Sequence, residues 1–426
     1  MIDFFDVDYK ENNNREEEPE SPPLFDFKHS IDISDLNYQQ KEAIKSISDW
    51  FKDENGTTIF GLAGYAGTGK TTIISHVIED LQLQDKTWFV TFTGKASLNL
   101  NKKNIPAKTI HSLIYKNQEE YDIKKEKMIY KSFLKSPDMI RGSLIVIDEI
   151  SMVSEKLLED LLTFNIPILA IGDNGQLPPI GADNMILNKP DYQLTEIHRQ
   201  AKDSPIISLA TDIRNGKGLK IGTLGKNVMI TKKISDEVYL RADQVLVGTH
   251  NIRKGINSLV RELKGYDSER VVVGDKIICR ENNWGILLPN DRVPLINGTV
   301  GNIVDIVGES FEEFSTFKSK EKINVEVMNI NFKPDFSDDI YQDLNICKSS
   351  LTTDDMQKEI HAIKKKMKDN LTYFLYGYAI TVHSSQGSEW NKVLVKNDYM
   401  WSEKEFYNKW MYTAVTRAKE SLIVKV

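Results

Sequence analysis

Cysteine is nearly absent from this sequence, with only Cys279 and Cys347 among 426 residues. Two cysteines cannot build a disulfide framework, and no CxxC pair or cluster of cysteine and histidine indicates a zinc site. Long apolar runs are lacking too, because none approaches the ~18 residues that a membrane span needs. The first residues, MIDFFDVDYKENNN, have neither the basic start nor the apolar stretch of a signal peptide. These absences predict a soluble, intracellular protein of the cytoplasm with no membrane partner.

An excess of positive charge is lacking as well, since the formal net charge is -7. Residues 1–35 hold 11 acidic and 3 basic side chains and leave 51 acidic and 52 basic ones in residues 36–426. A nearly neutral body can still carry a basic groove, so bulk charge does not decide whether nucleic acid binds. The polar, proline-bearing stretch 10–23 predicts that residues 1–35 form a disordered acidic tail. An acidic lure for a basic partner, or a mimic of a nucleic-acid backbone, remains the alternative.

What the sequence does contain is an alternation of helical and strand patterns from residue 36 onward. Hydrophobic residues make up 40% and charged residues 27%, which is ordinary globular usage, and the length predicts roughly two to four domains. Short apolar strands separated by helices predict an α/β fold with a parallel sheet covered on both faces. The first unit is predicted to contain helices at 37–51 and 70–82 and strands at 57–63, 87–92, 143–148 and 166–173.

A second α/β unit is predicted from about residue 204. Its strand at 244–249 is followed by a helix over NIRKGINSLVREL, and another strand is expected at 392–397. Between about 266 and 370 short strands are joined by glycine and asparagine turns, which predicts a small all-β insertion. We expect the helical pattern HAIKKKMKDNL to close this insertion and TYFLYGYAITV to resume the second unit.

The string GYAGTGKT satisfies the pattern GxxxxGK[ST], directly follows a predicted strand and opens a predicted helix. Its glycines let backbone N–H groups turn inward around an anion, and the helix N-terminus adds its positive end. Lys70 would reach the β- and γ-phosphates, and the Thr71 hydroxyl would hold Mg²⁺. The motif therefore predicts ATP and Mg²⁺ as cofactors. The predicted nucleotide-binding residues in it are Gly64, Gly67, Gly69, Lys70, Thr71 and Thr72.

A phosphate loop needs a carboxylate for its metal, and SLIVIDEIS supplies two adjacent acids at the end of an apolar strand. Asp148 is predicted to order Mg²⁺ through its water shell, and Glu149 to polarise the attacking water as a general base. A pair of acids after a strand can also cap a helix. The presence of the phosphate loop upstream favours the catalytic interpretation.

The segment GDNGQLPPI follows the next apolar strand and puts Asp173 and Gln176 beside the expected γ-phosphate. Together with the earlier motifs it resembles motif III of superfamily 1 helicases. LNYQQKEAI resembles the adenine-reading Q motif, with Gln40 at the position whose amide contacts the base. TFTGKASLNL resembles motif Ia, and KTIHSLIY resembles the next strand-contacting motif of the RecD-like branch.

The resemblance continues through the second unit. LTEIHRQ and YTAVTRAK put Arg199 and Arg417 at the arginine positions of motifs IV and VI, and GYAITVHSSQGSEW closely resembles motif V of RecD-like and phage Dda-like helicases. It covers residues 36–426 in outline, although 112–142 and 305–372 carry no motif of the family. The chain is thus similar to superfamily 1 DNA helicases of the RecD-like and Dda-like branch.

The resemblance implies two RecA-like parallel-sheet domains with a small pin insertion and an all-β SH3-like insertion. Residues 36–200 would form the first RecA-like domain, with the pin at about 115–141. The second would comprise 201–265 and 371–426, and the SH3-like insertion would be 266–370. Aromatic residues in the pin would stack on the first base pair, although they could equally pack a small helical hairpin. These aromatic candidates are Tyr115, Tyr121, Tyr130 and Phe133.

The two arginines have a physical role in this scheme. A guanidinium delivered to the charge on a transferring γ-phosphoryl group is worth about 10³ to 10⁵ in rate. If both Arg199 and Arg417 contact one ATP, the nucleotide must lie between the two units, and hydrolysis would move them against each other. The predicted catalytic residues are Lys70, Asp148, Glu149, Gln176, Arg199 and Arg417.

Translocation requires that both units hold the same strand through backbone-tracking polar groups and flat stacking side chains. His111 and His383 could instead be core histidines with satisfied hydrogen bonds. The predicted nucleic-acid contacts are Thr93, Lys95, His111 and Ser112 in the first unit and Thr249, Asn251, Thr381, His383 and Ser384 in the second.

The function that the resemblance implies is an ATP-dependent DNA helicase that translocates on single-stranded DNA and unwinds duplexes, with 5′-to-3′ polarity. Its partners would be single-stranded DNA, duplex junctions, and single-strand-binding or replication proteins, in a cytoplasm that includes that of a phage-infected host. Two alternatives remain open. One is a superfamily 1 RNA or 3′-to-5′ helicase, and the other is a nucleic-acid-stimulated ATPase that remodels complexes without separating strands.

Overall fold

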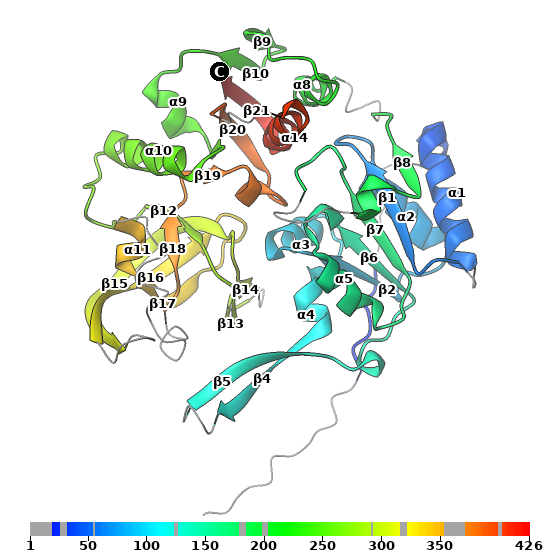
Figure 1. Cartoon of the computed structure of the whole chain (residues 1–426), viewed down its shortest axis with the longest axis horizontal. Coiled ribbons are helices and arrows are strands. Elements are labelled where there is room, and N and C mark those ends of the chain that lie inside the picture. Colours follow the sequence, from blue (N-terminus) through cyan, green and yellow to red (C-terminus); the bar gives the residue numbers. More distant parts are fainter. Residues whose placement is uncertain are drawn as a thin grey trace, which may run out of the picture.

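The computed structural model describes residues 19–25, 32–53, 56–122, 127–178, 185–197, 203–290, 293–315, 322–352, 371–398 and 403–426. Two α/β lobes and an antiparallel sheet surround a common centre, and a long hairpin extends from the first lobe (Figure 1). The α/β fold class predicted from the sequence is confirmed, because each lobe contains a largely parallel six-stranded sheet.

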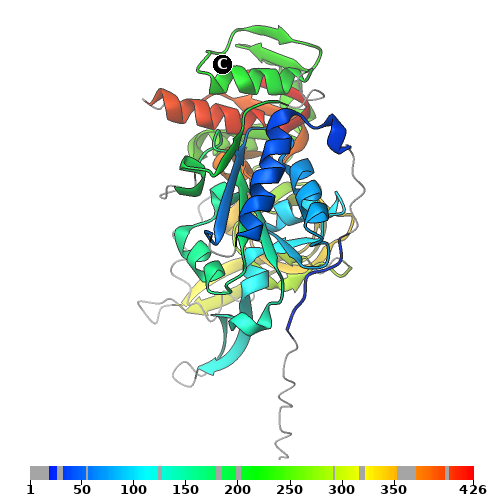
Figure 2. The ribbon, with the colours of Figure 1, turned by 90° about the vertical axis from the view of Figure 1, so that its right-hand side faces the viewer.

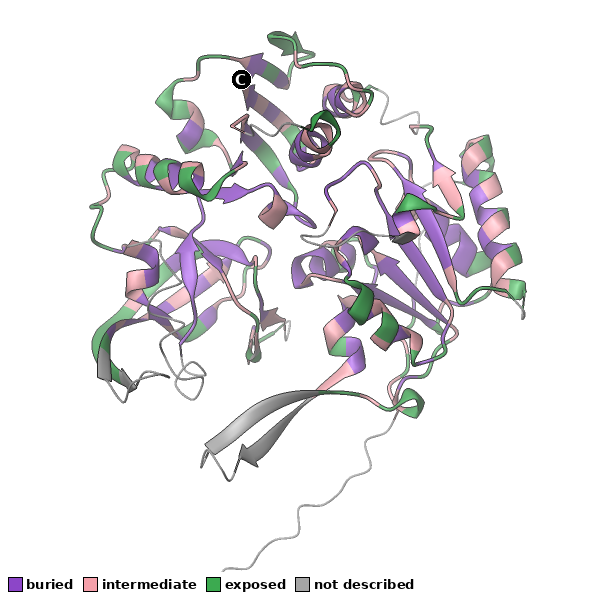
Figure 3. Cartoon of the chain, viewed as in Figure 1, coloured by how far each residue is buried: buried purple, intermediate pink, exposed green. Residues whose placement is uncertain are grey.

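The sheet of the first lobe is entirely parallel. Its strands are buried on both faces, because alternate residues such as Phe89 and Val90 belong to separate apolar clusters on its two sides. The central strands are purple almost throughout in Figure 3. In spatial order the strands are β3 (Ala107–Thr109), β2 (Thr87–Thr91), β6 (Leu144–Asp148), β7 (Ile168–Gly172), β1 (Ile59–Gly64) and β8 (Tyr192–Leu194).

Helices cover both faces of this sheet. One face carries α1 (Tyr38–Lys52) and α2 (Lys70–Asp80), and α1 lies in front of the sheet in Figure 2. The α1 helix begins at a capping box in which Asn37 and Gln40 satisfy each other's backbone N–H groups. The other face carries α4 (Ile110–Ile114) and α5 (Glu155–Leu162). The remaining described α-helices of the first lobe are α3 (Gly94–Asn101) and α6 (Met185–Asn188), and short 3-10 helices are formed by Ile33–Asp35, Pro137–Met139 and Ile150–Met152.

The predicted pin region is a β-hairpin of β4 (Tyr115–Asp122) and β5 (Lys127–Leu134), paired over their whole length. A helical hairpin, the alternative considered for this region, is therefore wrong. The chain passes from α4 into β4 without a loop, and the hairpin extends away from the lobe in both ribbon views (Figures 1 and 2).

The second lobe is built around a sheet with one antiparallel edge strand. In spatial order its strands are β19 (Ala379–Thr381), β11 (Gln244–Val247), β20 (Trp390–Lys396), β21 (Ala418–Lys425), β10 (Val228–Thr231) and β9 (Gly222–Leu224). One face is covered by α8 (Pro205–Arg214) and α14 (Lys404–Val415), and the other by α9 (Asp236–Arg241) and α10 (His250–Leu263).

The antiparallel sheet shares one apolar core with the α10 face of the second lobe, so the two form a continuous body. Its strands are β17 (Tyr341–Cys347), β16 (Lys322–Pro334), β15 (Val300–Ser315), β12 (Lys276–Cys279) and β18 (Phe374–Tyr376). Two short strands, β13 (Asn283–Leu287) and β14 (Pro294–Leu295), and the helix α11 (Lys348–Thr352) accompany it. The segment expected to resume the second unit first adds β18 to this sheet, and the chain returns to the second lobe only at Ala379. The helical pattern HAIKKKMKDNL lies outside the described residues.

The prediction that residues 1–35 form a disordered tail is wrong for residues 19–25 and also for 32–35, where Asp32 caps a 3-10 helix at Ile33–Asp35. Glu20 forms an isolated parallel bridge with Ile140, and the Phe25 side chain is 3% exposed. The Phe25 ring lies 4.4 Å from that of Phe89, between centroids. Acidic, proline-bearing composition predicted disorder because it offers little apolar surface to bury, but one phenylalanine and one glutamate suffice to attach this segment.

Candidate functional site

The phosphate loop lies between β1 and α2, as the sequence predicts. Gly67 and Gly69 have φ angles of 79° and 82°, which residues other than glycine rarely adopt. A Cβ atom on Gly69 would also lie 2.5 Å from Nε2 of Gln40. The Lys70 ammonium donates to the carbonyl oxygens of Gly64 and Tyr65 at 2.6 and 3.1 Å. Thr71 and Thr72 follow in the first turn of α2 and are half-buried.

Gln40 is 1% exposed and braces the phosphate loop from α1. Its Nε2 donates to the Thr68 carbonyl at 3.0 Å, and its Oε1 accepts from the Asn37 N–H at 3.0 Å. Both ends of the amide are therefore bonded within the protein. The adenine-reading role of Gln40 stays a prediction, and it requires this side chain to exchange at least one of these bonds.

Parallel strands bring the acidic motifs to the same edge of the sheet as the phosphate loop. β7 lies between β6 and β1, so Asp148, Glu149 and Asp173 all follow strands that end there. Glu149 has a left-handed backbone with φ of 58°, and its N–H donates to Asp148 Oδ1 at 3.1 Å. Burial raises the pKa of both carboxyls, and the charge of Asp148 helps to raise that of Glu149 to about 7, against the opposing charges of Arg417 and Lys70.

A hydrogen-bond chain crosses from the first lobe to the second at this edge. The Ala66 N–H donates to the Tyr412 hydroxyl at 2.8 Å, and that hydroxyl donates to Asp173 Oδ2 at 2.7 Å. Ala66 and Asp173 belong to the first lobe, whereas Tyr412 belongs to α14 of the second. Burial, then the charge of Asp173, raises the pKa of Tyr412, so the hydroxyl remains a donor at neutral pH. We call this junction of the lobes the seam.

Further bonds join the seam next to Gln176. The Leu177 N–H donates to Thr413 Oγ1 at 2.9 Å, and Gln386 Nε2 donates to the Leu177 carbonyl at 2.8 Å. Gln176 itself is 7% exposed, and its Oε1 has no hydrogen-bond partner among the described residues. A buried acceptor left free in this position is suited to orient a water molecule or a hydroxyl donor.

Arg417 is 4% exposed and lies on the second-lobe side of the seam. Its guanidinium donates to the carbonyls of Thr413 and Ser388 at 3.1 and 3.2 Å. Its charge is one of the two that oppose the raised pKa of Glu149, which puts the second-lobe arginine within electrostatic range of the first-lobe acid. Arg199 lies outside the described residues, so its predicted role is not tested.

Sequence motifs missed Tyr412 and a second contact that crosses the seam. The Arg214 guanidinium of α8 stacks over the Tyr65 ring with its carbon 3.6 Å from the centroid. The Tyr65 hydroxyl also accepts from Gln193 Nε2 at 3.0 Å. Tyr412 lies in YTAVTRAK, the same motif as Arg417, so this motif was a sequence signal that could have identified it. Arg214 lies in no motif.

A cavity of about 790 Å³ opens where the two lobes meet the antiparallel insertion. We call it the strand cavity. The first lobe lines it with α3 and α4, the second with the start of α10 and the segment after β19, and the insertion with Arg280, Asn282 and Asn297. None of the described residues that line it is acidic. The N-termini of α3 and α10 open here behind the caps Thr93 and Thr249, which adds positive potential.

Seven of the nine predicted nucleic-acid contacts line the strand cavity, namely Thr93, Lys95, His111, Thr249, Thr381, His383 and Ser384. Ser112 and Asn251 are exposed but do not line it. Burial lowers the pKa of both histidines, so the imidazoles are neutral at pH 7. They reach the cavity from different lobes.

Lys95 is the most unusual of these residues. It is 9% exposed, and its ammonium has no hydrogen-bond partner among the described residues. The ammonium lies 4.1 Å from the centroid of the Trp390 ring, which belongs to the second lobe. Burial lowers the pKa of Lys95 to about 7, so a polyanion in the cavity would favour its charged form.

The described residues contain no group of three or more His, Cys, Asp or Glu side chains arranged to share a metal ion. A magnesium ion that is bound mainly through phosphates and waters needs few protein ligands, so Thr71 and Asp148 stay the predicted pair. None of the helices in the described part of the chain has both the length and the apolar character that crossing a membrane requires.

Comparison with known proteins gives the same assignment as the motifs. A family model described as an AAA domain matches residues 35–233, and one described as a UvrD-like helicase C-terminal domain matches residues 376–424. The ATP-dependent DNA helicase Dda of Enterobacteria phage T4 is 29% identical over 284 residues, which cover 58% of this chain and 62% of that protein.

Two other relatives match over most of the chain. The ATP-dependent RecD2 DNA helicase of Deinococcus radiodurans is 26% identical, with 86% of this chain and 46% of that protein covered. The ATP-dependent DNA helicase Pif1 of Campylobacter jejuni is 24% identical, with 86% and 88% covered. The chain thus spans less than two thirds of the length of the phage and Deinococcus relatives. Helicase models and relatives match both lobes, so the chain is similar to the superfamily 1 helicases of the RecD-like and Dda-like branch.

Proposed function

We propose that this protein is an ATP-dependent DNA helicase that translocates 5′-to-3′ on single-stranded DNA and separates duplexes. The observation that carries the proposal is the seam, where the phosphate loop and the acids of the first lobe meet Tyr412 and Arg417 of the second. A nucleotide bound there would touch both lobes, so its hydrolysis would change their relative position.

The proposed ATP site uses the residues of the first lobe for binding and for the acid–base step. The phosphate-loop N–H groups and Lys70 would hold the phosphates, and Gly69 is required because Gln40 leaves no room for a side chain. Magnesium bound through Thr71 and Asp148 would neutralise charge on the β- and γ-oxygens. Glu149 would accept a proton from the attacking water, and the free Oε1 of Gln176 would orient that water.

The second lobe would complete the site. Arg417 would contact the γ-phosphate as the lobes close, and Arg199 would supply the second predicted arginine. A guanidinium that is already buried and bonded to carbonyls is held in place before the nucleotide arrives, which reduces the entropy lost on binding.

The strand cavity is the proposed path of single-stranded DNA. It is lined from both lobes, it is free of acidic side chains among its described lining residues, and two helix N-termini face it. Threonine and serine hydroxyls suit phosphate contacts, while His111, His383 and Phe92 offer flat surfaces for bases. Ser112 and Asn251 would then contact DNA only where it leaves the cavity.

The proposed domain division follows the sheets except at Phe374–Tyr376, which pair with the sheet of the insertion. Residues 36–200 and the pair 201–265 and 371–426 would be the two motor domains, and the insertion 266–370 would line the strand cavity through Arg280, Asn282 and Asn297. The β4–β5 hairpin would be the pin that splits the duplex, and an SH3-like role in strand guidance is proposed for the insertion. Relatives that are named as ATP-dependent DNA helicases support the activity, and the resemblance to the RecD-like branch supports the polarity.

Forked duplexes that carry a single 5′ or 3′ tail test the proposal. With ATP, the protein is expected to open the 5′-tailed fork and leave the 3′-tailed fork closed. Opening of only the 3′-tailed fork would contradict the polarity. If neither DNA fork opens while single-stranded DNA still stimulates ATP turnover, the protein is instead a nucleic-acid-stimulated ATPase, and the same forks made of RNA identify an RNA helicase.

The seam supplies a more local prediction. Tyr412→Phe removes the hydroxyl that bridges Ala66 and Asp173, and a buried hydrogen bond to a charged group contributes about 1.5 to 3 kcal/mol. We expect kcat for DNA-stimulated ATP hydrolysis to fall by roughly tenfold or more, because each 1.4 kcal/mol corresponds to a factor of ten. Tyr407→Phe is the matched control, since its hydroxyl bonds Asn397 within the second lobe. Equal losses in both variants would show that the bridge has no special role.

A further inference from the structure

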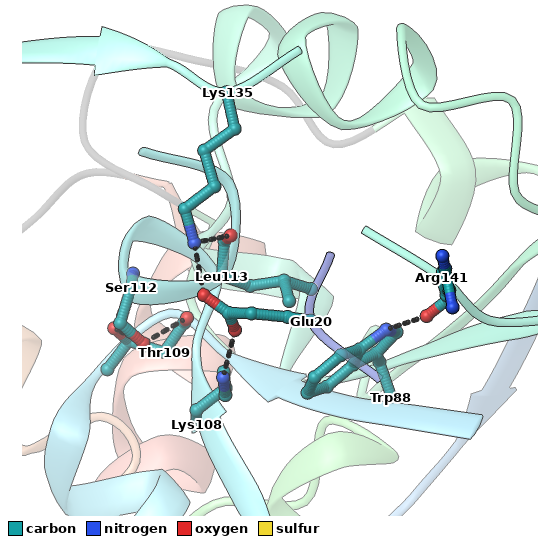
Figure 4. Close-up of polar contacts among 8 residues, drawn as sticks. All are labelled: Glu20, Trp88, Lys108, Thr109, Ser112, Leu113, Lys135 and Arg141. Carbon is teal, nitrogen blue, oxygen red and sulfur yellow. Dashed lines mark hydrogen bonds and ion pairs between the residues drawn. The ribbon is translucent and has the colours of Figure 1, made fainter. Parts of the chain in front are cut away.

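Residues 19–25, which we call the strap, run along the first lobe beside the base of the hairpin. The Glu20 N–H donates to the Met139 carbonyl at 2.8 Å, and the Arg141 N–H donates to the Glu20 carbonyl at 2.8 Å. The strap is thereby bonded to the connection that leads from β5 to β6. This connection is also held from the sheet, because Trp88 Nε1 donates to the Arg141 carbonyl at 2.7 Å (Figure 4).

The Glu20 carboxylate joins two lysines that come from different elements. One oxygen accepts from Lys108 of β3 at 2.9 Å, and the other accepts from Lys135 at the end of β5 at 2.7 Å (Figure 4). The side chains of Glu20 and Lys135 are 40% and 11% exposed. Partial burial alone would raise the pKa of Glu20, but the hydrogen bonds from the lysines outweigh it and lower the pKa below its ordinary value. The carboxylate is therefore charged at neutral pH.

Lys135 is the residue at which the hairpin rejoins the lobe. Its N–H donates to the Ile114 carbonyl and its ammonium to the Leu113 carbonyl, both at 2.8 Å. Both carbonyls belong to α4, the helix that also carries His111 of the strand cavity. Glu20 thus connects the hairpin base with the strand β3 that precedes α4.

The strap is fixed at its far end as well. The Phe25 N–H donates to the Gln84 carbonyl at 2.9 Å, and the Phe25 ring is buried against Phe89 of β2. Because the strap is attached at both ends, a force on Glu20 is transmitted to the core of the first lobe. A strap attached only at Glu20 would move with the hairpin and would not restrain it.

A hairpin joined to a lobe only by its two chain ends can swing about them. One side of this base is held by Tyr115, whose hydroxyl donates to Asp160 of α5 at 2.5 Å. The opposite side is held by Lys135 and Glu20. If the hairpin is to split a duplex, it must not yield when the motor pushes it against the junction, so both anchors matter.

We propose that Glu20 is a positioning residue for strand separation, because it locks the base of the β4–β5 hairpin to β3 and α4. The inference rests on the proposed helicase function. It assigns the acidic strap a mechanical role and not that of a nucleic-acid mimic. Neither Lys108 nor Lys135 lines the strand cavity, so Glu20 does not cover residues that the strand would contact.

Glu20→Gln tests the inference, because it preserves the volume of the side chain and removes the charge that both lysines share. We expect opening of the 5′-tailed fork per ATP hydrolysed to fall by about threefold to tenfold, a range that partly exposed ion-pair networks can supply. The kcat of ATP hydrolysis on single-stranded DNA and the affinity for oligo(dT) are expected to stay within about twofold, because neither the seam nor the strand cavity is touched.

Three further variants make the test specific. Lys135→Met breaks the same contact from the hairpin side, and we expect the double variant Glu20→Gln with Lys135→Met to be no worse than Lys135→Met alone. Lys135→Met also keeps the test valid if Glu20→Gln reduces the yield of folded protein. Asp138→Asn is the charge control, since Asp138 is exposed on the same connection. Asp138 takes no part in the two bonds that join the Glu20 carboxylate to Lys108 and Lys135.

Three results would overturn the inference while the helicase proposal stands. The first is unchanged fork opening per ATP in Glu20→Gln, and the second is an equal loss in Asp138→Asn. The third is tighter oligo(dT) binding with unchanged coupling, which would make Glu20 an electrostatic mask. If the unaltered protein opens no fork at all, the proposed function fails instead, so the two failures are distinguishable.

Discussion

Replacing Glu149 by glutamine is expected to lower ATP turnover by about 10²- to 10⁴-fold, the usual contribution of a positioned general base. ATP binding should persist, because the phosphate loop and Lys70 are unchanged. Glutamine has nearly the same volume but cannot accept a proton at neutral pH. The raised pKa of Glu149, caused first by burial and then by Asp148, makes its carboxylate a better proton acceptor than an exposed glutamate.

Single-turnover hydrolysis and the binding of a fluorescent ATP analogue separate these two effects. Glu155→Gln, in the first turn of the nearby α5, is a suitable control because its side chain is exposed and outside the seam. Turnover of Glu149→Gln within a few-fold of the unaltered protein would remove Glu149 as the base. The neighbouring Asp148 would then be the next residue to replace.

Removal of Arg417 is expected to have an effect of similar or larger size. An arginine that stabilises the γ-phosphoryl transition state contributes about 10³ to 10⁵ in rate where it has been measured, so Arg417→Ala should reduce kcat far more than ATP affinity. Arg417→Lys should recover only part of the loss, because an ammonium lacks the planar fork of a guanidinium. Both variants leave the first-lobe part of the ATP site intact.

A structural contribution of Arg417 has to be separated from this catalytic one. The guanidinium also bonds the carbonyls of Thr413 and Ser388, so the alanine variant requires a thermal unfolding measurement beside the kinetics. Arg241→Ala removes an exposed arginine of the second lobe that pairs with Glu237, and should change neither quantity. An effect of Arg417→Ala confined to KM would make it a binding residue.

Much of the proposed ATP site followed from the sequence because its motifs are contiguous. The phosphate loop, the acids after β6 and the segment after β7 each combine an apolar strand with the polar residues that directly follow it. Parallel pairing then brings such strand ends to one edge of a sheet, so their proximity was predictable. Gln40 illustrates the limit, since the motif predicted that its amide reads adenine but not that this amide would be bonded on both sides within the protein.

The insertion and the strap were harder to predict. Glycine and asparagine turns indicated strands between 266 and 370, but the pairing of Phe374–Tyr376 with β12 connects residues about 100 positions apart and leaves no local pattern. Residues 19–25 looked disordered by composition. Glu20 contacts Lys108 and Lys135, which lie 88 and 115 positions away along the chain. No short stretch of the sequence therefore contains Glu20 together with either lysine.

The sequence by itself determined the α/β class, the main strands of the first lobe, and the positions of the nucleotide motifs, because each depends on periodicity and turn residues within a short window. Tertiary structure alone decided that Tyr412 bridges the lobes, that Lys95 is buried over Trp390, and that Glu20 holds the hairpin base. These contacts join residues that are distant along the chain. Their energies depend on burial and on the charges brought alongside, and the packed fold sets both.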